Sequence, residues 1–165
     1  MIAAGVRSAP LMREIGHRAP IIAERGYHIQ SSRTRWPQEL PPVVFEERAL
    51  VATRFASGLR ATSFVEFARD EAPADEGNWK RLIRHSAELG LPFDNPPDTW
   101  LGSRPTFPDY LPAIGRSTRD PRTLYAFGHQ HLGLTLAPVT GEIIAALAHD
   151  ERPPVDVLPF AIERF

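Results

Sequence analysis

Arg104 stands between a glycine-bearing strand and a proline turn, in the run 102–105 that reads Gly-Ser-Arg-Pro. An arginine constrained in this way is positioned in advance, and its planar guanidinium can bind a carboxylate through two parallel hydrogen bonds. The alternative interpretation is structural, with Arg104 pairing with Asp109 or Asp98 to clamp the surrounding chain. The sequence leaves both interpretations open.

The segment Gly128–Pro138 is the second candidate for chemistry, because it is rich in glycine and leads into a predicted helix. Glycines at 128 and 133 permit positive φ angles and a close approach of the backbone to a flat ligand. The amino terminus of the following helix offers unpaired N–H groups and the positive end of the helix dipole. Such a site suits a phosphate, a carboxylate or the electron-rich edge of a flavin ring. A strand–loop–helix connection also needs glycine for its geometry alone, which is the simpler interpretation.

The pair His129 and His131 suggests a metal site, since two imidazoles on one loop can share an ion. A third ligand is needed, and none stands at a customary spacing. The other histidines, at positions 17, 28, 85 and 149, form no cluster, so a structural role is favoured and no metal is expected. The chain contains no cysteine, which excludes thiol catalysis, disulfides and cysteine-zinc sites. It also lacks GxSxG, HExxH, phosphate-loop and GxGxxG motifs.

The composition is that of an ordinary folded domain. The chain has 165 residues, of which 42% are hydrophobic and 24% charged, and its formal net charge is −1. At about 100–200 residues per domain, this length allows one domain or two very small ones. The balanced charge argues against nucleic acid as a partner, and no apolar stretch is long enough for a transmembrane segment. The opening residues lack the features of a signal peptide, so a cytoplasmic location is expected.

The elements that must position these residues begin with a short apolar run, Ile2–Gly5. Ser8 is predicted to cap a helix over Ala9–Ile15, so the run resembles a buried strand that enters a βα turn. Strands of this kind usually have neighbours on both sides, and nothing before Ile2 supplies them. We therefore expect this run to be disordered or to pair with another chain. A frayed amino terminus is the alternative.

The middle of the chain predicts an antiparallel sheet and one helix. Four β-type runs are expected, the first with a bulge at its glycine and the last two joined by a tight turn at Ser57-Gly58. They cover Ala19–Gln30, Val43–Glu46, Ala49–Phe55 and Leu59–Phe67. Helical spacing of apolar residues then predicts a helix over 75–90, with Asp75 as its cap, Gly90 as its stop, and Trp79, Leu82 and Leu89 facing the sheet.

The last third is predicted to be irregular at first and regular at its end. Pro92 to Pro112 is dense in proline and is expected to lack regular structure. A strand is predicted over Leu124–Phe127 and a helix over Val139–Ala148, with Pro138 at or near its first position. The predicted fold class is α+β: a mostly antiparallel sheet with flanking helices, lacking an amino-terminal nucleotide-binding βαβ unit.

Five segments together resemble the carboxy-terminal part of the FAD-dependent oxidoreductases of the D-amino acid oxidase type. Within that family, the chain is most similar to the bacterial D-amino acid dehydrogenases. The segments occur in family order and are Ala3–Ser8, Pro20–His28, Thr62–Phe67, Trp100–Gly115 and Gly128–Pro138.

The chain departs from the family pattern in three respects. The amino-terminal half with its GxGxxG motif is missing, Arg7 stands where tryptophan is common, and Ser63 stands near a usual threonine. In the family, the missing half holds the adenosine and pyrophosphate of FAD.

The resemblance implies that the complete enzyme uses FAD to deaminate a D-amino acid oxidatively to a 2-oxo acid, by hydride transfer to the flavin. It implies that Arg104 binds the substrate carboxylate and that Tyr27 and His129 line the substrate pocket. Residues that would face the cofactor are Gly128, His131, Leu132, Gly133, Leu134 and Thr135. The helix that follows would place its positive end near the flavin.

The resemblance also divides the chain into a flavin-domain remnant at 1–18, a substrate-binding domain at 19–98, and flavin-facing motifs with a helix at 99–165. We expect the isolated chain to bind FAD weakly or not at all and to be inactive by itself. One alternative is a non-catalytic, truncated remnant. Others are a homodimer, or one subunit of a heteromer whose partner supplies the nucleotide-binding half. If a quinone accepts the electrons, the complete enzyme is expected at the periphery of the inner membrane.

Overall fold

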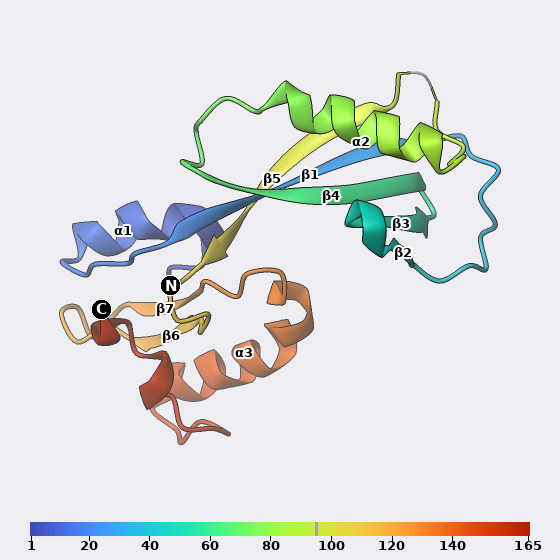
Figure 1. The fold of residues 1–165 in the computed structure, drawn as a ribbon. Coiled ribbons are helices and arrows are strands. Elements are labelled where there is room, and N and C mark those ends of the chain that lie inside the picture. Colours follow the sequence, from blue (N-terminus) through green and yellow to red (C-terminus); the bar gives the residue numbers. More distant parts are fainter. Residues whose placement is uncertain (95) are drawn as a thin grey trace. The chain divides into compact units, whose positions relative to one another are not determined.

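The computed structural model describes residues 1–94 and 96–165 (Figure 1). It contains α1 (Ser8–Glu14), β1 (Ile22–Ser31), β2 (Val43–Phe45), β3 (Leu50–Phe55), β4 (Gly58–Ala68), α2 (Glu76–Glu88), β5 (Asp98–Thr106), β6 (Ala113–Arg116), β7 (Leu124–Phe127) and α3 (Gly133–Ala148). The chain divides into two compact units. The first comprises 1–24, 67–70 and 103–165, and the second 25–66 and 71–102. The predicted α+β class, with a mostly antiparallel sheet, is confirmed.

The sheet has five strands in the order β2-β3-β4-β1-β5. Phe55 of β3 pairs with Gly58 of β4, so the tight turn consists of Ala56 and Ser57, one residue earlier than predicted. Gly58 has a φ of +130°, and a Cβ there would lie 1.9 Å from the Ser31 carbonyl oxygen. Only glycine therefore fits at the start of β4.

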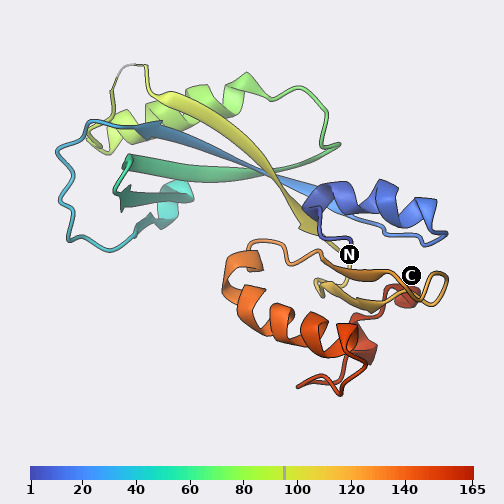
Figure 2. The same ribbon diagram turned by 180° about the vertical axis from the view of Figure 1, so that it is seen from behind.

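Helix α2 runs along one face of this sheet (Figures 1 and 2). Its predicted cap is confirmed, because Asp75 Oδ1 accepts a hydrogen bond of 2.9 Å from the N–H of Gly77. Leu82 is fully buried in a core cluster that includes Ile29 and Leu59. The predicted contribution of Trp79 and Leu89 is also confirmed, since both pack against that cluster. The second unit thus has a helix-on-sheet core.

Strand β5 lies where the sequence predicted an irregular stretch, and that prediction was wrong for Asp98–Thr106. The wrong prediction came from the high density of prolines in this stretch, because a proline lacks the N–H that a sheet ladder needs. Since β5 is the outer strand of the sheet, Pro105 is accommodated on it. Asn95, which falls inside the same predicted stretch, lies outside the described residues.

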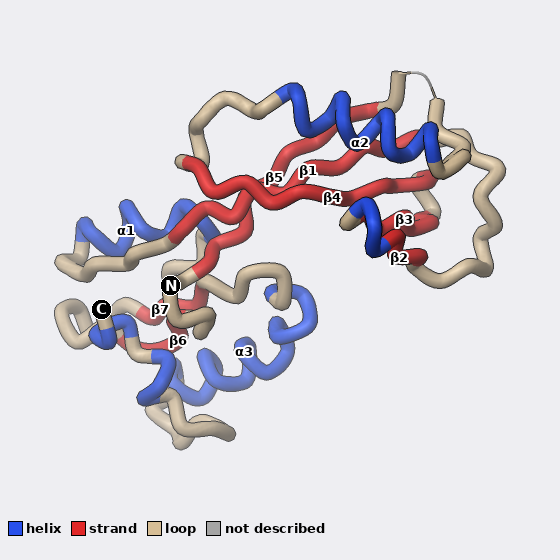
Figure 3. Tube along the Cα trace, in the orientation of Figure 1, coloured by secondary structure: helices blue, strands red, loops and turns tan. Residues whose placement is uncertain are grey.

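The first unit is built around the antiparallel pair β6 and β7, with α3 beside it (Figure 3). The bounds of β7 agree with the prediction, whereas β6 was not predicted. The core of this unit consists of buried side chains from distant parts of the chain, namely Met12, Phe107, Ala113, Tyr125, Phe127 and Ile162. The unit therefore depends on contacts between its amino-terminal, central and carboxy-terminal segments.

The apolar run at the amino terminus finds a neighbour within the same chain. Ile2 forms a parallel bridge with Tyr125: its N–H donates to the Leu124 carbonyl at 2.8 Å, and its carbonyl accepts from the Ala126 N–H at 3.0 Å. The expectation of disorder was therefore wrong at Ile2, which pairs within its own chain. Pairing of the run with a second chain stays a prediction. Ser8 is the first residue of α1 rather than its cap, and its Oγ accepts from the N–H of Ala4.

Helix α3 begins at Gly133, six residues earlier than predicted, and Pro138 lies inside it. The prediction rested on the preference of proline for the first helical turn. An internal proline removes one helical hydrogen bond, here the one to the carbonyl of Leu134, but the helix continues through it. As a result, residues 133–135 belong to a helical turn rather than to a loop. No helix in the described part of the chain has the length and apolarity needed to cross a membrane.

Candidate functional site

The Arg104 side chain lies on β5 and is 29% exposed. Its Nη1 is 3.9 Å from Glu24 Oε1, which is a long ion pair, and Glu24 Oε2 accepts a 2.9 Å hydrogen bond from the Thr106 hydroxyl. The proposed clamp to Asp109 was wrong, because that carboxylate binds Arg164 instead. Among the described residues, 1–94 and 96–165, Glu24 is the one acidic residue whose carboxylate lies within 4.0 Å of the Arg104 guanidinium. Most donors of the Arg104 guanidinium thus remain available for a ligand.

The loop that begins at Gly128 is held tightly against the same segment of chain. Gly128 is buried, with a φ of +85°, and a Cβ there would lie 2.3 Å from Phe107 Cε2. The N–H of Gln130 donates to the carbonyl of Pro105 at 3.1 Å. Pro105 follows Arg104 directly, so this bond joins the two segments that the sequence singled out. They lie together within the first unit.

The predicted cofactor-facing residues after this loop are exposed and lead into α3. They are His131, Leu132, Gly133, Leu134 and Thr135. In the described residues, the first turn of α3 contains no acidic residue, and no side chain forms a capping hydrogen bond at its amino terminus. The amino-terminal N–H groups and the positive end of the helix dipole are therefore uncompensated. This arrangement suits the electron-rich edge of a ring system.

His129 follows Gly128 but directs its ring toward α3, where Nε2 is 3.0 Å from the hydroxyl oxygen of Thr140. Burial lowers the pKa of His129, because the charged imidazolium loses its hydration there. A neutral imidazole is thus favoured next to the loop.

Tyr27 lies in the second unit and is fully buried. Its hydroxyl donates a 2.6 Å hydrogen bond to Glu66 Oε2 and accepts one of 2.9 Å from the N–H of Asp75. The ring meets Trp79 edge to face, with the centroids 5.3 Å apart. Within the second unit, the Tyr27 hydroxyl therefore joins β4 to the start of α2.

The sequence model of the DAO family, described as FAD dependent oxidoreductase, matches residues 1–147. The chain belongs to this family. The D-amino-acid oxidase of Bradyrhizobium diazoefficiens is 36% identical over 175 residues, which cover all of this chain and 40% of that protein. The D-amino acid dehydrogenase of Paramagnetospirillum magneticum is 32% identical, with the same shares covered. The chain therefore spans about two fifths of the length of these relatives.

Solved structures share the fold at lower sequence identity. The glycine oxidase of Geobacillus kaustophilus superposes with a TM-score of 0.81 at 21% identity, over 99% of this chain and 44% of that one. The L-amino acid deaminase of Proteus vulgaris, with a specific insertion deleted, gives a TM-score of 0.74 at 23% identity, over 99% and 42%. These likenesses show the fold of this DAO-family chain and do not distinguish among substrates.

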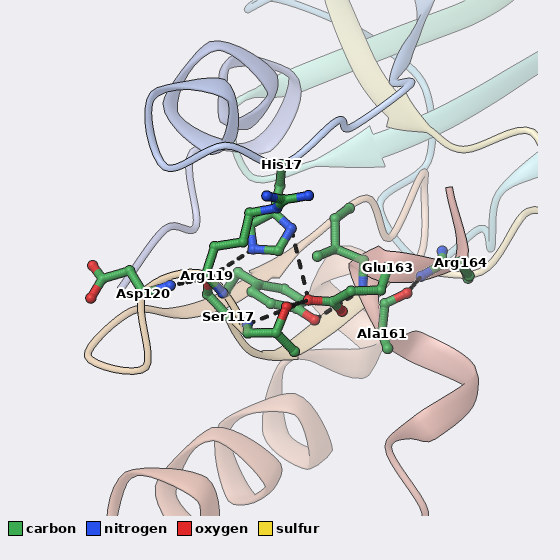
Figure 4. A network of polar contacts seen from close by, with 10 residues as sticks. His17, Ser117, Arg119, Asp120, Ala161, Glu163 and Arg164 are labelled. Carbon is green, nitrogen blue, oxygen red and sulfur yellow. Dashed lines mark hydrogen bonds and ion pairs between the residues drawn. The ribbon is translucent and has the colours of Figure 1, made fainter.

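One polar network of this family member was not predicted from its sequence (Figure 4). His17 Nε2 is 2.8 Å from Ser117 Oγ, and His17 Nδ1 is 3.8 Å from Glu163 Oε1. Ser117 Oγ also accepts from the N–H groups of Arg119 and Asp120, so its single proton goes to His17. The order of residue types matches a hydrolase triad, but Ser117 is 2% exposed and its lone pairs are occupied. The network therefore joins segments of the first unit rather than presenting a nucleophile.

A second unpredicted feature is an aromatic pair in the second unit. Trp100 is 54% exposed and stacks on His28, with the ring centroids 4.7 Å apart and an interplanar angle of 16°. A Cβ on Gly102 would lie 1.8 Å from Trp100 Cη2, so the indole lies across that glycine. Burial, together with the positive charge of Arg60, lowers the pKa of His28 to about 4. The alternation of residues along β5 places Trp100 and Gly102 on one face, which is the signal that could have found this contact.

The described residues 1–94 and 96–165 contain no group of three or more His, Cys, Asp or Glu side chains arranged to hold a metal ion.

Proposed function

We propose that this chain is the substrate-facing and flavin-facing part of an FAD-dependent D-amino acid oxidoreductase, and that it is inactive by itself. The hydrogen bond from the Gln130 N–H to the Pro105 carbonyl carries the proposal, because it joins the Arg104 strand to the candidate flavin-facing loop. The names of the relatives support the choice of D-amino acids: one is a D-amino-acid oxidase and another a D-amino acid dehydrogenase. Their greater length supports the need for a further portion that binds the nucleotide.

In this proposal, Arg104 binds the α-carboxylate of the amino acid. The long contact to Glu24 leaves the guanidinium fork free to form two parallel hydrogen bonds, which fix both the position and the orientation of the substrate. Glu24 keeps its second oxygen on the Thr106 hydroxyl, so a carboxylate that arrives at Arg104 does not have to displace a close ion pair.

The residues that would hold the flavin are Gly128, His131, Leu132, Gly133, Leu134 and Thr135. They fit such a group, because the first turn of α3 is exposed and, in the described chain, has neither a side-chain cap nor an acidic residue. The N–H groups of this turn would stabilise negative charge on the edge of the ring. When bound, FAD supplies the acceptor for the two electrons and the hydrogen that leave the substrate.

His129 is proposed to line the substrate pocket as a neutral group, because burial lowers its pKa. Tyr27, in the second unit, is kept as a candidate substrate-binding residue on the family resemblance alone, and within that unit its hydroxyl is fixed by Glu66 and Asp75. In the overall reaction the amino acid loses a hydride, which carries both electrons, and a proton, and so becomes an imine. Water then converts the imine to a 2-oxo acid and ammonia.

The proposal predicts that the isolated chain does not bind FAD tightly. No GxGxxG motif is present among the 165 residues, and this motif normally anchors the pyrophosphate at a helix amino terminus. Titration of the purified chain with FAD, followed by flavin fluorescence, measures the binding. Stoichiometric binding at micromolar concentration would contradict the prediction.

A chimera tests the function directly. The amino-terminal portion of the Bradyrhizobium D-amino-acid oxidase is joined to this chain, in place of the segment that the chain matches. We expect the folded chimera to carry a flavin absorbance spectrum and to oxidise D-alanine in preference to L-alanine. A folded chimera that binds flavin but oxidises neither enantiomer, or that prefers L-alanine, would overturn the proposed substrate class.

A further inference from the structure

The carboxy-terminal turn, residues 161–165, is fixed to the body of the first unit by Ile162, Arg164 and Phe165. The N–H of Ile162 donates to the hydroxyl of Tyr125 at 2.9 Å, and Ile162 is 1% exposed. Arg164 Nε donates to Asp109 Oδ2 at 2.6 Å, and Arg164 Nη2 donates to the Leu111 carbonyl at 2.8 Å. Figure 4 shows Arg164 beside Glu163 and Ala161 in this turn. The turn is therefore hydrogen-bonded to the segment 107–111, which follows β5.

The same turn contacts this segment through aromatic rings. Phe165 stacks on Phe107, with the centroids 5.0 Å apart and an interplanar angle of 15°. The Arg164 guanidinium carbon lies 5.2 Å from the centroid of Phe107 and 4.5 Å from that of Phe165. Phe107 is fully buried, and it is the ring that a Cβ on Gly128 would strike. A continuous line of contacts thus runs from Phe165 through Phe107 to Gly128.

A second line of contacts reaches the loop through strained backbone. Gln130 and Tyr110 have φ angles of 54° and 61°, a region that residues other than glycine seldom adopt. The Gln130 side-chain amide donates to the Tyr110 carbonyl at 2.7 Å, so the two strained residues are tied together. Arg164 binds the residues on both sides of Tyr110, namely Asp109 and Leu111. Strained backbone persists only where the surroundings hold it, and Arg164 is part of those surroundings.

We propose that Arg164 and Phe165 are positioning residues for the loop Gly128–Gln130, and that they act through the segment 107–111. The proposal rests on the proposed function only in calling this loop flavin-facing. The match to the DAO family ends at residue 147, so the carboxy-terminal turn lies outside it.

Amide hydrogen exchange of the full 165-residue chain, followed by NMR, tests the proposal. The Gln130 N–H reports directly, because it is protected by the Pro105 carbonyl. In Phe165→Ala and in Arg164→Ala, we expect this amide to exchange about tenfold faster or more, since its local opening becomes easier. The amides that pair β6 with β7 should accelerate much less than Gln130, and by no more than the loss of overall stability accounts for.

Three further variants separate positioning from general loss of stability. Phe165→Tyr keeps the stacked ring and should restore the protection of Gln130. Arg164→Lys keeps the charge without the planar fork and should restore it only in part. Leu158→Ala alters a side chain that is 75% exposed in the preceding turn and should leave the loop unchanged.

Unchanged exchange at Gln130 in both alanine variants would overturn the proposal. Equal acceleration of all amides of the first unit would also overturn it, because the turn would then contribute only to overall stability. The measurement needs no flavin and no turnover. The hydrogen-exchange result therefore does not depend on whether the chimera oxidises D-alanine. Likewise, unchanged exchange at Gln130 would not contradict the proposed function, which the chimera tests separately.

Discussion

The carboxy-terminal turn and the end of β5 each present an arginine near a carboxylate, but the two contacts differ in kind. Arg164 donates to Asp109 at 2.6 Å, to the carbonyls of Leu111 and Ala161, and lies over two aromatic rings. Arg104 has Glu24 at 3.9 Å. The Arg164 side chain is 17% exposed and that of Arg104 is 29% exposed. The protein supplies acceptors for most of the N–H donors of Arg164, whereas Arg104 has one long ion pair.

This difference indicates which arginine serves the fold and which is available to a ligand. A guanidinium has five N–H donors, and those buried without partners are costly. At Arg164 the protein supplies the acceptors, so its removal should act on stability. At Arg104 a ligand carboxylate can supply them, so its removal should act on substrate binding and turnover.

The largest effect is expected for Arg104→Ala in the chimera that oxidises D-alanine. Loss of one partner of a close charged pair costs roughly 2–5 kcal/mol, which corresponds to well over a tenfold loss in kcat/KM. Arg104→Lys should recover only part of it, because an ammonium lacks the planar fork. Steady-state kinetics of the purified variants measure both effects.

The matched control is Arg122→Ala, whose side chain is 93% exposed and lies on the turn between β6 and β7. It should leave kcat/KM unchanged. If turnover also stays unchanged in Arg104→Ala, Arg104 does not bind the substrate carboxylate. The distinction between a ligand-binding and a structural arginine is then wrong.

The sequence predicted the fold best where local signals decide it. Asp75 and Gly90 bound α2 because a side-chain cap and a glycine stop act within one turn of the helix. The bounds of β7 were also predicted, from a short apolar run before a glycine. Both cases need only the residues next to each other in the chain.

The sequence failed where position in the sheet or distance along the chain decides the outcome. Pro105 suggested irregular structure, but it lies on an outer strand, where a missing N–H does not disrupt the sheet. One interpretation paired Arg104 with Asp109 or Asp98, whereas the structure pairs Asp109 with Arg164, 55 residues away. The contact between His17 and Ser117 spans 100 residues. No local pattern encodes such pairs.

A smaller effect is expected for Arg164→Ala on the stability of the isolated chain. Hydrogen bonds to a charged group contribute about 1.5–3 kcal/mol, so the melting temperature should fall by several degrees. Arg104→Ala should cost less than about 1 kcal/mol, because its ion pair is long and partly exposed. Thermal unfolding of both variants measures the difference. Equal losses in the two variants would show that the two sites do not differ as the geometry indicates.

The smallest effect is the pH dependence of the melting temperature. It separates the contribution of the Asp109 charge from that of the side chain's size and hydrogen bonds. Burial of this carboxyl acts to raise its pKa, but the hydrogen bonds from Arg164 and from the Leu111 N–H outweigh burial, so its pKa is lowered. A carboxyl whose pKa is lower in the folded state stabilises the fold fully above its unfolded pKa of about 3.9. That contribution is lost as the pH falls through the folded value, because both states then become protonated.

Asp109→Asn keeps the oxygen that accepts from the Leu111 N–H and removes the negative charge. The wild-type chain should therefore melt higher than this variant at pH 6, and the gap should close as the pH falls below about 4. In an Arg164→Ala background the gap should be small at every pH, since the guanidinium that lowers the pKa is gone. Melting curves of the four chains from pH 6 downward test this. A gap that persists at the lowest pH would mean that Asp109 stabilises the turn by its shape and hydrogen bonds alone, and that its contribution does not depend on the ion pair with Arg164.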